Sequence, residues 1–359
     1  MIDRTFWKGK RIFLTGHTGF KGSWLTLLLK SLGAKVYGYA LNPISKPNFF
    51  DNLGLSKFLV KDCREDILQI KNLRKEILKA KPSIVFHLAA QSSVLVSYKD
   101  PIETIKTNIL GTSCFLEAIK NIKDIKSVIV VTTDKVYLNL EEKKQFKEDS
   151  RLGGFDIYSS SKAACEIITE SYIKSFFLNS NSKISTVRSG NCIGGGDWTK
   201  DRIIKDCVES FINNKKLVIR SPNATRPWQH VLDPLCGYIR LAEKLYFDKQ
   251  NKFTGPWNFG PNKNKNLKVK QIVKIGKNII KSKSKIILKK KKFYESKNLS
   301  LNSNKAKKLL NWKTKINEIE ALKMTFEWYK NYYDKNLRKD LIKFSFKQIE
   351  KFRLKHKIF

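Results

Sequence analysis

Short runs of apolar, largely β-branched residues alternate with longer amphipathic stretches through the first half of the chain. The apolar runs predict strands at Arg11–Thr15, Lys35–Ala40, Phe58–Val60, Ser83–Ala89, Ser127–Thr133 and Ile184–Arg188. The stretches between them predict helices near Phe20–Leu32, Asp66–Ala80, Pro101–Asn121 and Tyr158–Phe177. Several runs are apolar at nearly every position, as is typical of strands buried on both faces. The alternation predicts an α/β fold with a doubly wound parallel sheet.

After Arg188 this rhythm breaks at loop signals such as Gly194–Asp197 and Gly255–Pro256. We expect residues 1–188 to form the sheet domain, together with a returning segment at about 229–250. Residues 189–228 and 251–330 are expected to form a smaller substrate-binding region over the open end of the sheet. Residues 331–359 are expected to form a basic helical tail, and the Lys-rich stretch 281–292 has no assigned role.

The formal net charge of +39 changes this picture little. Residues 251–359 hold 31 basic and 7 acidic side chains, a net of +24. The basic residues are 59 Lys and only 12 Arg, whereas proteins that read nucleic acid rely on the bidentate fork of Arg. We therefore interpret the charge as a surface property and expect no nucleic-acid partner.

Cysteines and histidines give no metal-binding pattern. The six cysteines form no CxxC pair and show no ligand spacing with the four histidines, so no metal is expected. The N-terminal residues hold no apolar segment, and no run of 18 apolar residues follows. The sequence therefore predicts a reduced cytoplasmic protein without a membrane partner.

A glycine-rich loop connects the first predicted strand to the first helix. It reads Gly16-His17-Thr18-Gly19-Phe20-Lys21-Gly22. Glycines at such a turn let the backbone approach a pyrophosphate at the N-terminus of the helix, so a Rossmann-like dinucleotide site is expected. The end of the second strand, Tyr39–Asn42, has neither an acid nor an Arg, which leaves NAD and NADP open from this stretch. Asp62 is a candidate partner of the adenine.

Two further groups of residues point to chemistry at one edge of the sheet. Tyr158 and Lys162 are four residues apart on a predicted helix and therefore share a face. A phenol is a weak base at neutral pH unless a neighbouring cation favours the phenolate, and Lys162 supplies that cation. Thr133, Asp134 and Lys135 follow the fifth strand, at the edge where open parallel sheets bind ligands.

Together these motifs resemble the extended short-chain dehydrogenase/reductase family. Further matching segments are His87–Gln91, Asn108–Thr112, Gly190–Trp198 and Ala224–His230, so the resemblance spans nearly the whole chain. Within the family, Thr133-Asp134-Lys135 is similar to the Thr-Asp-Glu of nucleotide-sugar 4,6-dehydratases. Lys in place of that Glu resembles the members that act on CDP-glucose, and implies a role in deoxysugar and lipopolysaccharide O-antigen biosynthesis.

The resemblance implies a cofactor, a substrate and an assembly. NAD would be bound by the glycine-rich loop, and by Asp62, Cys63, Leu88, Ala89, Ala90, Gln91, Thr107, Thr132, Tyr158 and Lys162. The nucleotide sugar, CDP-glucose, would be bound by Asn191, Arg202, Arg220, Arg226 and Asn258. The family usually dimerises through the helices predicted at 101–121 and 158–177, so a homodimer or a dimer of dimers is expected.

The resemblance also implies catalytic roles. Tyr158 would remove the proton of the sugar C4 hydroxyl while Thr133 holds its oxygen, and Lys162 would orient the nicotinamide ribose. Asp134 would act as the acid at C6. Lys135 would act either as the C5 base or as a cation that stabilises the enolate.

Alternatives remain open from the sequence. A nucleotide-sugar 4-epimerase of the same fold would share Tyr158 and Lys162 but would not require the acid and cation after Thr133. A catalytically silent dinucleotide sensor or a nucleic-acid-binding protein would use the cofactor loop or the charge alone. The preference for CDP over UDP or dTDP is also open, because Asn302 stands where the family usually has Asp.

Overall fold

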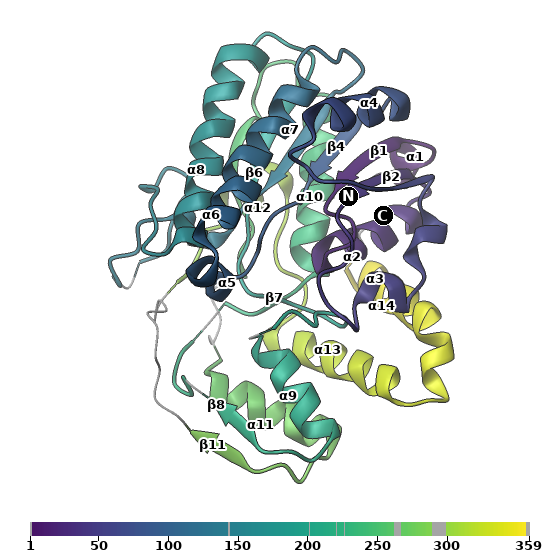
Figure 1. The fold of residues 1–359 in the computed structure, drawn as a ribbon, viewed down its shortest axis with the longest axis vertical. Helices are drawn as coiled ribbons and strands as arrows, with labels where there is room; N and C mark the ends of the chain where they lie inside the picture. Colours follow the sequence, from purple (N-terminus) through teal and green to yellow (C-terminus); the bar gives the residue numbers. More distant parts are fainter. Residues whose placement is uncertain are drawn as a thin grey trace.

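A seven-stranded parallel sheet forms the centre of the molecule (Figure 1). The computed structural model describes residues 2–142, 144–200, 202–219, 221–225, 227–261, 267–288 and 299–356. The strand order is β10-β6-β5-β4-β1-β2-β3. The strands of this sheet are β1 (Arg11–Thr15), β2 (Lys35–Ala40), β3 (Lys61–Arg64), β4 (Ile84–His87), β5 (Ser127–Val131), β6 (Lys183–Arg188) and β10 (Gly255–Asn258).

Both faces of the sheet are buried, because successive strand residues point to opposite sides. Ile12 and Leu14 of β1 join one hydrophobic cluster, and Phe13 between them joins another. Ile84 and Val85 of β4 divide in the same way. The predicted doubly wound α/β sheet is confirmed.

Helices cover the two faces of the sheet in separate layers (Figure 1). α2 and α10 supply residues to the first cluster, whereas α4 and α7 supply residues to the second. The α-helices with eight or more residues are α2 (Phe20–Ser31), α4 (Ile70–Ala80), α7 (Gly111–Ile119), α8 (Ile157–Tyr172), α9 (Ile203–Ile212), α10 (Leu232–Tyr246), α11 (Val269–Ile280), α13 (Glu318–Tyr333) and α14 (Leu341–His356). The shorter ones are α1 (Arg4–Trp7), α3 (Phe49–Asn52), α5 (Val94–Lys99), α6 (Pro101–Ile105) and α12 (Asn304–Leu310).

The strand order reverses at β1, which pairs with β2 on one side and with β4 on the other. At such a switch point the connections leave towards opposite faces, and a crevice opens beyond the carboxyl ends of the strands. The loops that follow β1, β4, β5 and β6 therefore meet at one edge, and these loops hold most of the predicted site residues.

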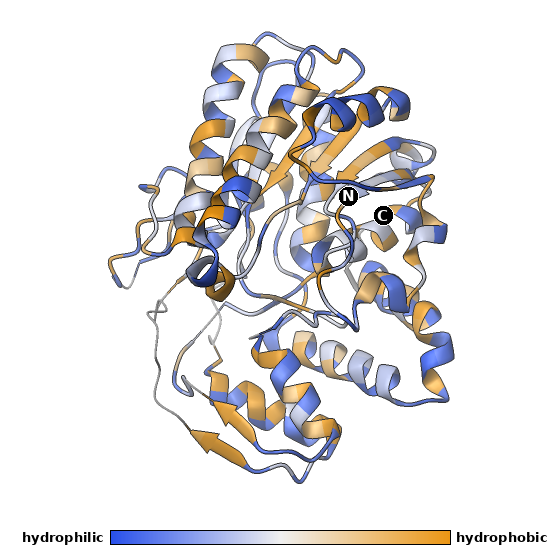
Figure 2. Cartoon of the chain, in the orientation of Figure 1, coloured by the Kyte–Doolittle hydropathy of each residue, from blue (hydrophilic) through white to orange (hydrophobic). Residues whose placement is uncertain are grey.

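A smaller group of elements lies beyond this edge (Figure 1). It contains α9 and α11 and a two-stranded parallel sheet of β8 (Leu217–Ile219) and β11 (Ile286–Leu288). β7 (Cys192–Ile193) and β9 (Gln229–His230) form a second short pair near the cavity. β10 pairs with β6, so the segment returning to the main sheet extends beyond the expected limit of about residue 250. Figure 2 shows apolar positions along the main-sheet strands and along α11.

Several predicted boundaries are wrong. The strand expected at 58–60 is replaced by a 3₁₀ turn, Leu55–Phe58, followed by β3; this edge strand is only half-buried, so its apolar pattern is weak. The helices expected at 101–121 and 158–177 each contain a π-helical turn, at Lys106–Leu110 and Ile173–Phe177. The expected tail helix is interrupted between α13 and α14. Part of the Lys-rich stretch 281–292 lies outside the described residues.

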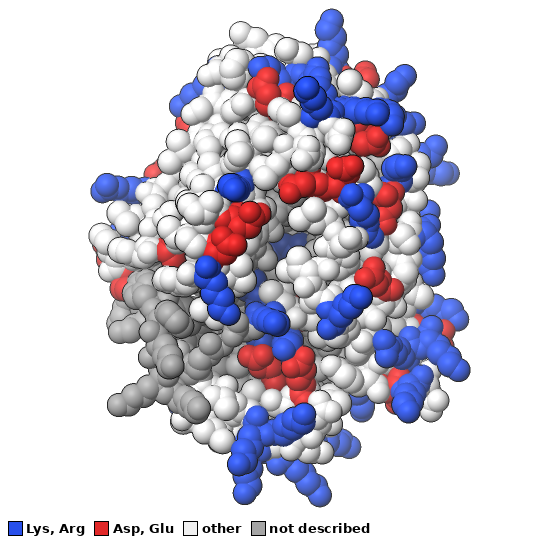
Figure 3. All heavy atoms as spheres, viewed as in Figure 1, with Lys and Arg blue, Asp and Glu red and all other residues white. Residues whose placement is uncertain are grey.

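Two surface properties complete the description. Lys and Arg side chains are scattered among Asp and Glu on the face seen in Figure 3, around a hollow near its centre. In the described part of the chain, no helix is long and apolar enough to cross a membrane.

Candidate functional site

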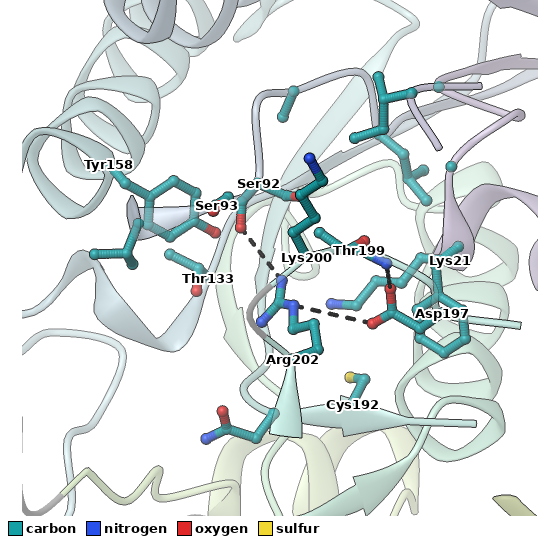
Figure 4. A pocket seen from close by; sticks show the side chains of 18 of the residues that line it. Lys21, Ser92, Ser93, Thr133, Tyr158, Cys192, Asp197, Thr199, Lys200 and Arg202 are labelled. Carbon is teal, nitrogen blue, oxygen red and sulfur yellow. Dashed lines mark hydrogen bonds and ion pairs between the residues drawn. The ribbon is translucent and has the colours of Figure 1, made fainter. Parts of the chain in front are cut away.

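A cavity of about 660 Å³ opens at the carboxyl ends of the central strands. The glycine-rich loop after β1, the loop after β5 and the start of α8 all line it. The segment after β6 and residues of α9 close the other side. Figure 4 shows Tyr158 and Thr133 on one side of this space and Lys21 and Cys192 on another. The predicted cofactor loop and the predicted catalytic residues therefore share one cavity.

The glycine-rich loop is tight because two of its glycines have no room for a side chain. Gly16 has a φ of +72°, and a Cβ there would lie 2.6 Å from the backbone nitrogen of Ala89. A Cβ on Gly22 would overlap the carbonyl oxygen of Gly16. Thr18, Gly19 and the other loop residues except His17 line the cavity. The free N–H groups at the start of α2 follow this loop, as a dinucleotide site requires.

His17 of the glycine-rich loop pairs with Asp62, and its predicted cofactor contact stays a prediction. Its side chain is fully buried and lies 2.8 Å from Asp62, which also pairs with Arg64 at 2.7 Å. Burial opposes ionisation of Asp62, but hydrogen bonds from His17 and Arg64 lower the pKa of this carboxyl. Asp62 and Cys63 do not line the cavity, whereas Glu65 and Asp66 do.

Some residues near the loop after β4 line the cavity, and others hold the loop in place. Leu88, Ala89 and Ala90 line the cavity, as does Thr107. Gln91 does not; its side chain instead donates to the carbonyl oxygen of Ser93 and to Thr104.

Asn108 fixes the backbone of this loop. Its Oδ1 accepts from the Gln91 nitrogen at 2.8 Å, and its Nδ2 donates to Ser161 of α8 at 2.9 Å. Gln91 and Asn108 therefore connect the loop to the helix that holds Tyr158.

Tyr158 and Lys162 lie on the first turns of α8. This helix begins after Asp156, whose side chain accepts from the backbone nitrogen of Ser159. Tyr158 is 7% exposed and Lys162 is 5% exposed, and both line the cavity. Lys162 Nζ donates to the carbonyl oxygen of Val131 at 3.1 Å. The end of β5 therefore fixes the ammonium of Lys162.

Thr133, Asp134 and Lys135 form a connected group after β5. Asp134 has a fully buried side chain. Its Oδ1 accepts from the Thr133 hydroxyl at 3.1 Å and lies 3.4 Å from Lys135 Nζ. Its Oδ2 has no hydrogen-bond partner among the described residues. The group thus places an acid and a cation beside Tyr158 in the same cavity.

A buried ion pair supports the strand ends below this group. Glu166 of α8 pairs with Arg188 at 2.8 Å, and it accepts hydrogen bonds from Thr132 and Thr186. Arg188 also donates to the hydroxyl of Tyr137. Because Glu166 and Arg188 each make several hydrogen bonds, this network holds the ends of β5 and β6 in a fixed relation.

The predicted substrate residues lie in different parts of the structure. Asn191 and Arg202 line the cavity; Arg202 donates to the carbonyl oxygen of Ser92 at 3.3 Å and lies 3.9 Å from Asp197 (Figure 4). The Asn258 side chain is fully buried among Tyr137, Phe146 and Asn302, and it does not line the cavity. Arg220 and Arg226 lie outside the described residues.

Two residues of the site were missed as candidates. Ser189 lies directly after β6 and lines the cavity, and Gly190, which does not line it, follows with no room for a side chain beside Asp134. Their place after a central strand is the signal that identified Thr133, and it could have identified them too. Tyr238, which bonds Ser189 at 2.6 Å, lies within α10 and has no such signal.

The pKa values of Lys21 and His87 are both shifted by their surroundings. Burial disfavours the charge of Lys21, but the acidic groups of Cys192, Tyr238, Tyr158 and Asp134 outweigh it and raise the pKa of Lys21 above its ordinary value. Burial, aided by the Lys162 charge, lowers the pKa of His87 to about 3. No cluster of metal-ligating side chains is found among the described residues.

Comparisons with known proteins identify the family of this chain. The family model for GDP-mannose 4,6 dehydratase matches residues 13–325. CDP-glucose 4,6-dehydratase of Salmonella typhimurium is 48% identical over 266 residues, which are 73% of this chain and 74% of the relative. dTDP-D-glucose 4,6-dehydratase of Dictyostelium discoideum is 31% identical over 66% of this chain and 56% of its own.

Solved structures share the fold. dTDP-glucose 4,6-dehydratase from Bacillus anthracis, in complex with NAD, has a TM-score of 0.76 at 22% identity, covering 93% of this chain and 100% of its own. UDP-glucose 4-epimerase from Thermotoga maritima, with UDP-glucose, has a TM-score of 0.77 at 22% identity, covering 90% and 99%. The resemblance predicted from the sequence is confirmed, and the chain belongs to the GDP-mannose 4,6 dehydratase family.

Proposed function

We propose that the protein is an NAD-dependent nucleotide-sugar 4,6-dehydratase that converts CDP-D-glucose into CDP-4-dehydro-6-deoxy-D-glucose and water. The observation that carries this proposal is the shared cavity of Thr133, Asp134, Lys135 and Tyr158. A 4-epimerase needs the tyrosine but has no use for an acid beside it. The 48% identical CDP-glucose 4,6-dehydratase supports both the reaction and the sugar nucleotide.

The residues present fit NAD. The loop from Gly16 to Gly22 brings the backbone close to the start of α2, where a pyrophosphate is stabilised by free N–H groups and the helix dipole. The glycine-rich loop, Leu88, Ala89, Ala90 and Thr107 would hold the dinucleotide, and Lys162 would orient the nicotinamide ribose. When bound, NAD would supply reversible hydride transfer, from the sugar C4 and back to C6.

The chain's own residues move the protons. Tyr158 takes the proton of the C4 hydroxyl, and Thr133 holds that oxygen. The resulting ketone acidifies the C5 proton. Asp134 then donates a proton to the C6 hydroxyl, which leaves as water; its buried position keeps this carboxyl away from solvent. Lys135 is the C5 base or stabilises the enolate.

Binding of a diphosphate requires cations at the other side of the cavity. Arg202 is 45% exposed, and its contact with Asp197 is long at 3.9 Å, so its guanidinium can turn to a bidentate contact with phosphate. Asn191 has a buried side-chain nitrogen without a partner among the described residues, and we assign it to the substrate. Asn258 supports the wall instead, and the roles of Arg220 and Arg226 stay predictions.

We further propose a homodimer, or a dimer of dimers, in the cytoplasm, where NAD and activated sugars are available. α6, α8 and the π-helical turns expose apolar side chains, including Ile102, Ile105, Leu110, Ile167 and Phe176. A stripe of this kind favours a helical interface with a second copy. The 4-keto-6-deoxy product would enter deoxysugar biosynthesis, with lipopolysaccharide O-antigen as the proposed destination.

The decisive experiment incubates the protein with NAD⁺ and, in turn, CDP-, dTDP- and UDP-glucose. We expect CDP-glucose to be converted fastest, to a product lighter by one water in mass spectrometry. Tyr158→Phe is the matched control, since it removes one hydroxyl. A product of unchanged mass would instead identify an epimerase. Absence of turnover with all three sugars, together with salt-sensitive nucleic-acid binding, would overturn the enzyme assignment.

A further inference from the structure

Lys21 occupies an unfavourable place for a cation. It is the second residue of α2, after Gly19 at the N-cap. The N-terminus of a helix carries partial positive charge, so a lysine there is disfavoured by the helix dipole. Its side chain nevertheless turns into the cavity, as Figure 4 shows. A cation kept in this position points to a ligand with negative charge.

The contacts of Lys21 show where its ammonium lies, and hence where a negatively charged ligand group would meet it. Nζ donates to the hydroxyl of Ser189 at 2.9 Å, and this hydroxyl also bonds Tyr238 at 2.6 Å. Ser189 follows β6, which is the strand beside β5 and the Thr133–Lys135 group. The ammonium therefore extends from the cofactor loop towards the strand ends that hold the catalytic residues.

No buried carboxylate neutralises this ammonium directly. Among the described residues, Lys21 Nζ bonds the hydroxyls of Ser189 and Tyr238, and no carboxylate oxygen lies within 4.0 Å. Lys135 and Lys162 line the same cavity, and the carboxylates at this end are Asp134, which is buried, and Asp156 at the start of α8. Three ammonium groups therefore face two carboxylates at the catalytic end of the cavity before substrate binds.

We propose that Lys21 is a further catalytic residue, whose ammonium stabilises the negative charge on the sugar C4 oxygen during water elimination. This inference rests on the proposed dehydratase function. It gives the enolate-stabilising role to Lys21 and leaves the C5 base role to Lys135. Positive charge held in advance near a developing oxyanion is among the largest contributions to catalysis.

The elimination step balances with these residues. The base takes the C5 proton, and the electron pair of that C–H bond forms the C4–C5 double bond while the ketone π electrons move to the C4 oxygen. Lys21 donates a hydrogen bond to this oxygen and keeps its own proton. When the enolate collapses, the C6–O bond breaks and the oxygen leaves as water with the proton of Asp134. The sugar is left as a conjugated enone.

Deuterium exchange separates this role from cofactor binding. The 4-keto-6-deoxy product still has its C5 proton, so the holoenzyme should exchange it with D₂O, observed by NMR, through a C4–C5 enolate whose charge lies on the same C4 oxygen. Lys21→Gln keeps a donor for Ser189 but removes the charge. We expect exchange and kcat to fall about 100-fold to 1,000-fold. Lys21→Arg should recover most of the rate, whereas KM for CDP-glucose and the affinity for NAD should stay within about threefold.

Each other outcome has a defined meaning. If wild-type protein does not convert CDP-glucose, the proposed function fails, whatever the variants do. If wild-type protein is active and Lys21→Gln exchanges C5 at the same rate, only the role of Lys21 fails. A loss removed by saturating NAD would also overturn it and make Lys21 a cofactor ligand. Lys21→Met serves as the second neutral variant if Lys21→Gln does not fold, with circular dichroism as the check.

Discussion

Gly190 is predicted to hold Asp134 in its working position by having no side chain. A Cβ on residue 190 would lie 2.5 Å from the carboxyl carbon of Asp134, and closer still to its Oδ2. Non-bonded carbon atoms need about 3.5 Å. In Gly190→Ala the carboxyl group must therefore retreat by about 1 Å. It has little freedom to do so, because the Asp134 side chain is fully buried.

The expected loss follows from this displacement. A misplacement of about 1 Å at a reacting group costs about 100-fold in rate. We expect kcat for water elimination to fall by that factor in Gly190→Ala, with KM changed less than threefold. The extra methyl group should also lower the free energy of unfolding by about 1–3 kcal/mol. Product formation by mass spectrometry and urea unfolding measure the two effects.

A double-mutant cycle tests whether the effect acts through the carboxyl group. Asp134→Ala removes the two nearest atoms and leaves the Cβ of residue 134 at 3.3 Å from the new methyl group. Adding Gly190→Ala to Asp134→Ala should therefore cost little further activity or stability. Two independent, additive losses would contradict this explanation. A Gly190→Ala variant with wild-type kcat would refute the positioning of Asp134 by Gly190.

Three further predictions follow from the site, the surface and the core. Tyr158→Phe should lower turnover at least 1,000-fold while NAD affinity, measured by calorimetry, stays unchanged; retention of 10% of the activity would exclude Tyr158 as the C4 base. Ile167→Glu should produce monomers in analytical ultracentrifugation, whereas Leu354→Glu, at another exposed apolar side chain, should not. Burial lowers the pKa of His230 to about 3, so below pH 6.5 protons bind the unfolded chain preferentially and stability falls as pH falls. The loss is about 2 kcal/mol at pH 5, and urea unfolding of His230→Gln should show a flatter pH dependence.

The sequence predicted the parts of the fold that burial makes periodic. The bounds of β1 and β2 agree with the predicted ones, because both strands are enclosed by helices and their residues are apolar. β3 was misplaced because it is an edge strand with partly exposed residues. The π-helical turns and the break between α13 and α14 depend on packing and leave no periodic signal.

Site residues could be predicted from the sequence where they directly follow a strand or begin the next helix. Thr133 and Tyr158 were identified by their place in the strand–helix order, and both line the cavity. His17 and Asp62 stay predictions as cofactor residues; their side chains pair with each other, a contact that the sequence pattern does not reveal. The substrate role of Asn258 stays a prediction, and its hydrogen bonds to Tyr137 and Phe146 could not be read from the sequence because they depend on the tertiary structure.

The lysines show why net charge and local charge answer different questions. Most of the 59 lysines are solvated, and solvated charges near a surface interact weakly with one another. Lys21, Lys135 and Lys162 line one cavity where water is partly excluded, so each interacts strongly with any charge nearby. At the catalytic end these three cations outnumber the carboxylates of Asp134 and Asp156, which makes this part of the cavity favourable for a substrate that acquires negative charge as it reacts. The enolate of a 4-keto sugar is such a species, whereas a 4-epimerase forms only the ketone, for which three cations would give little advantage.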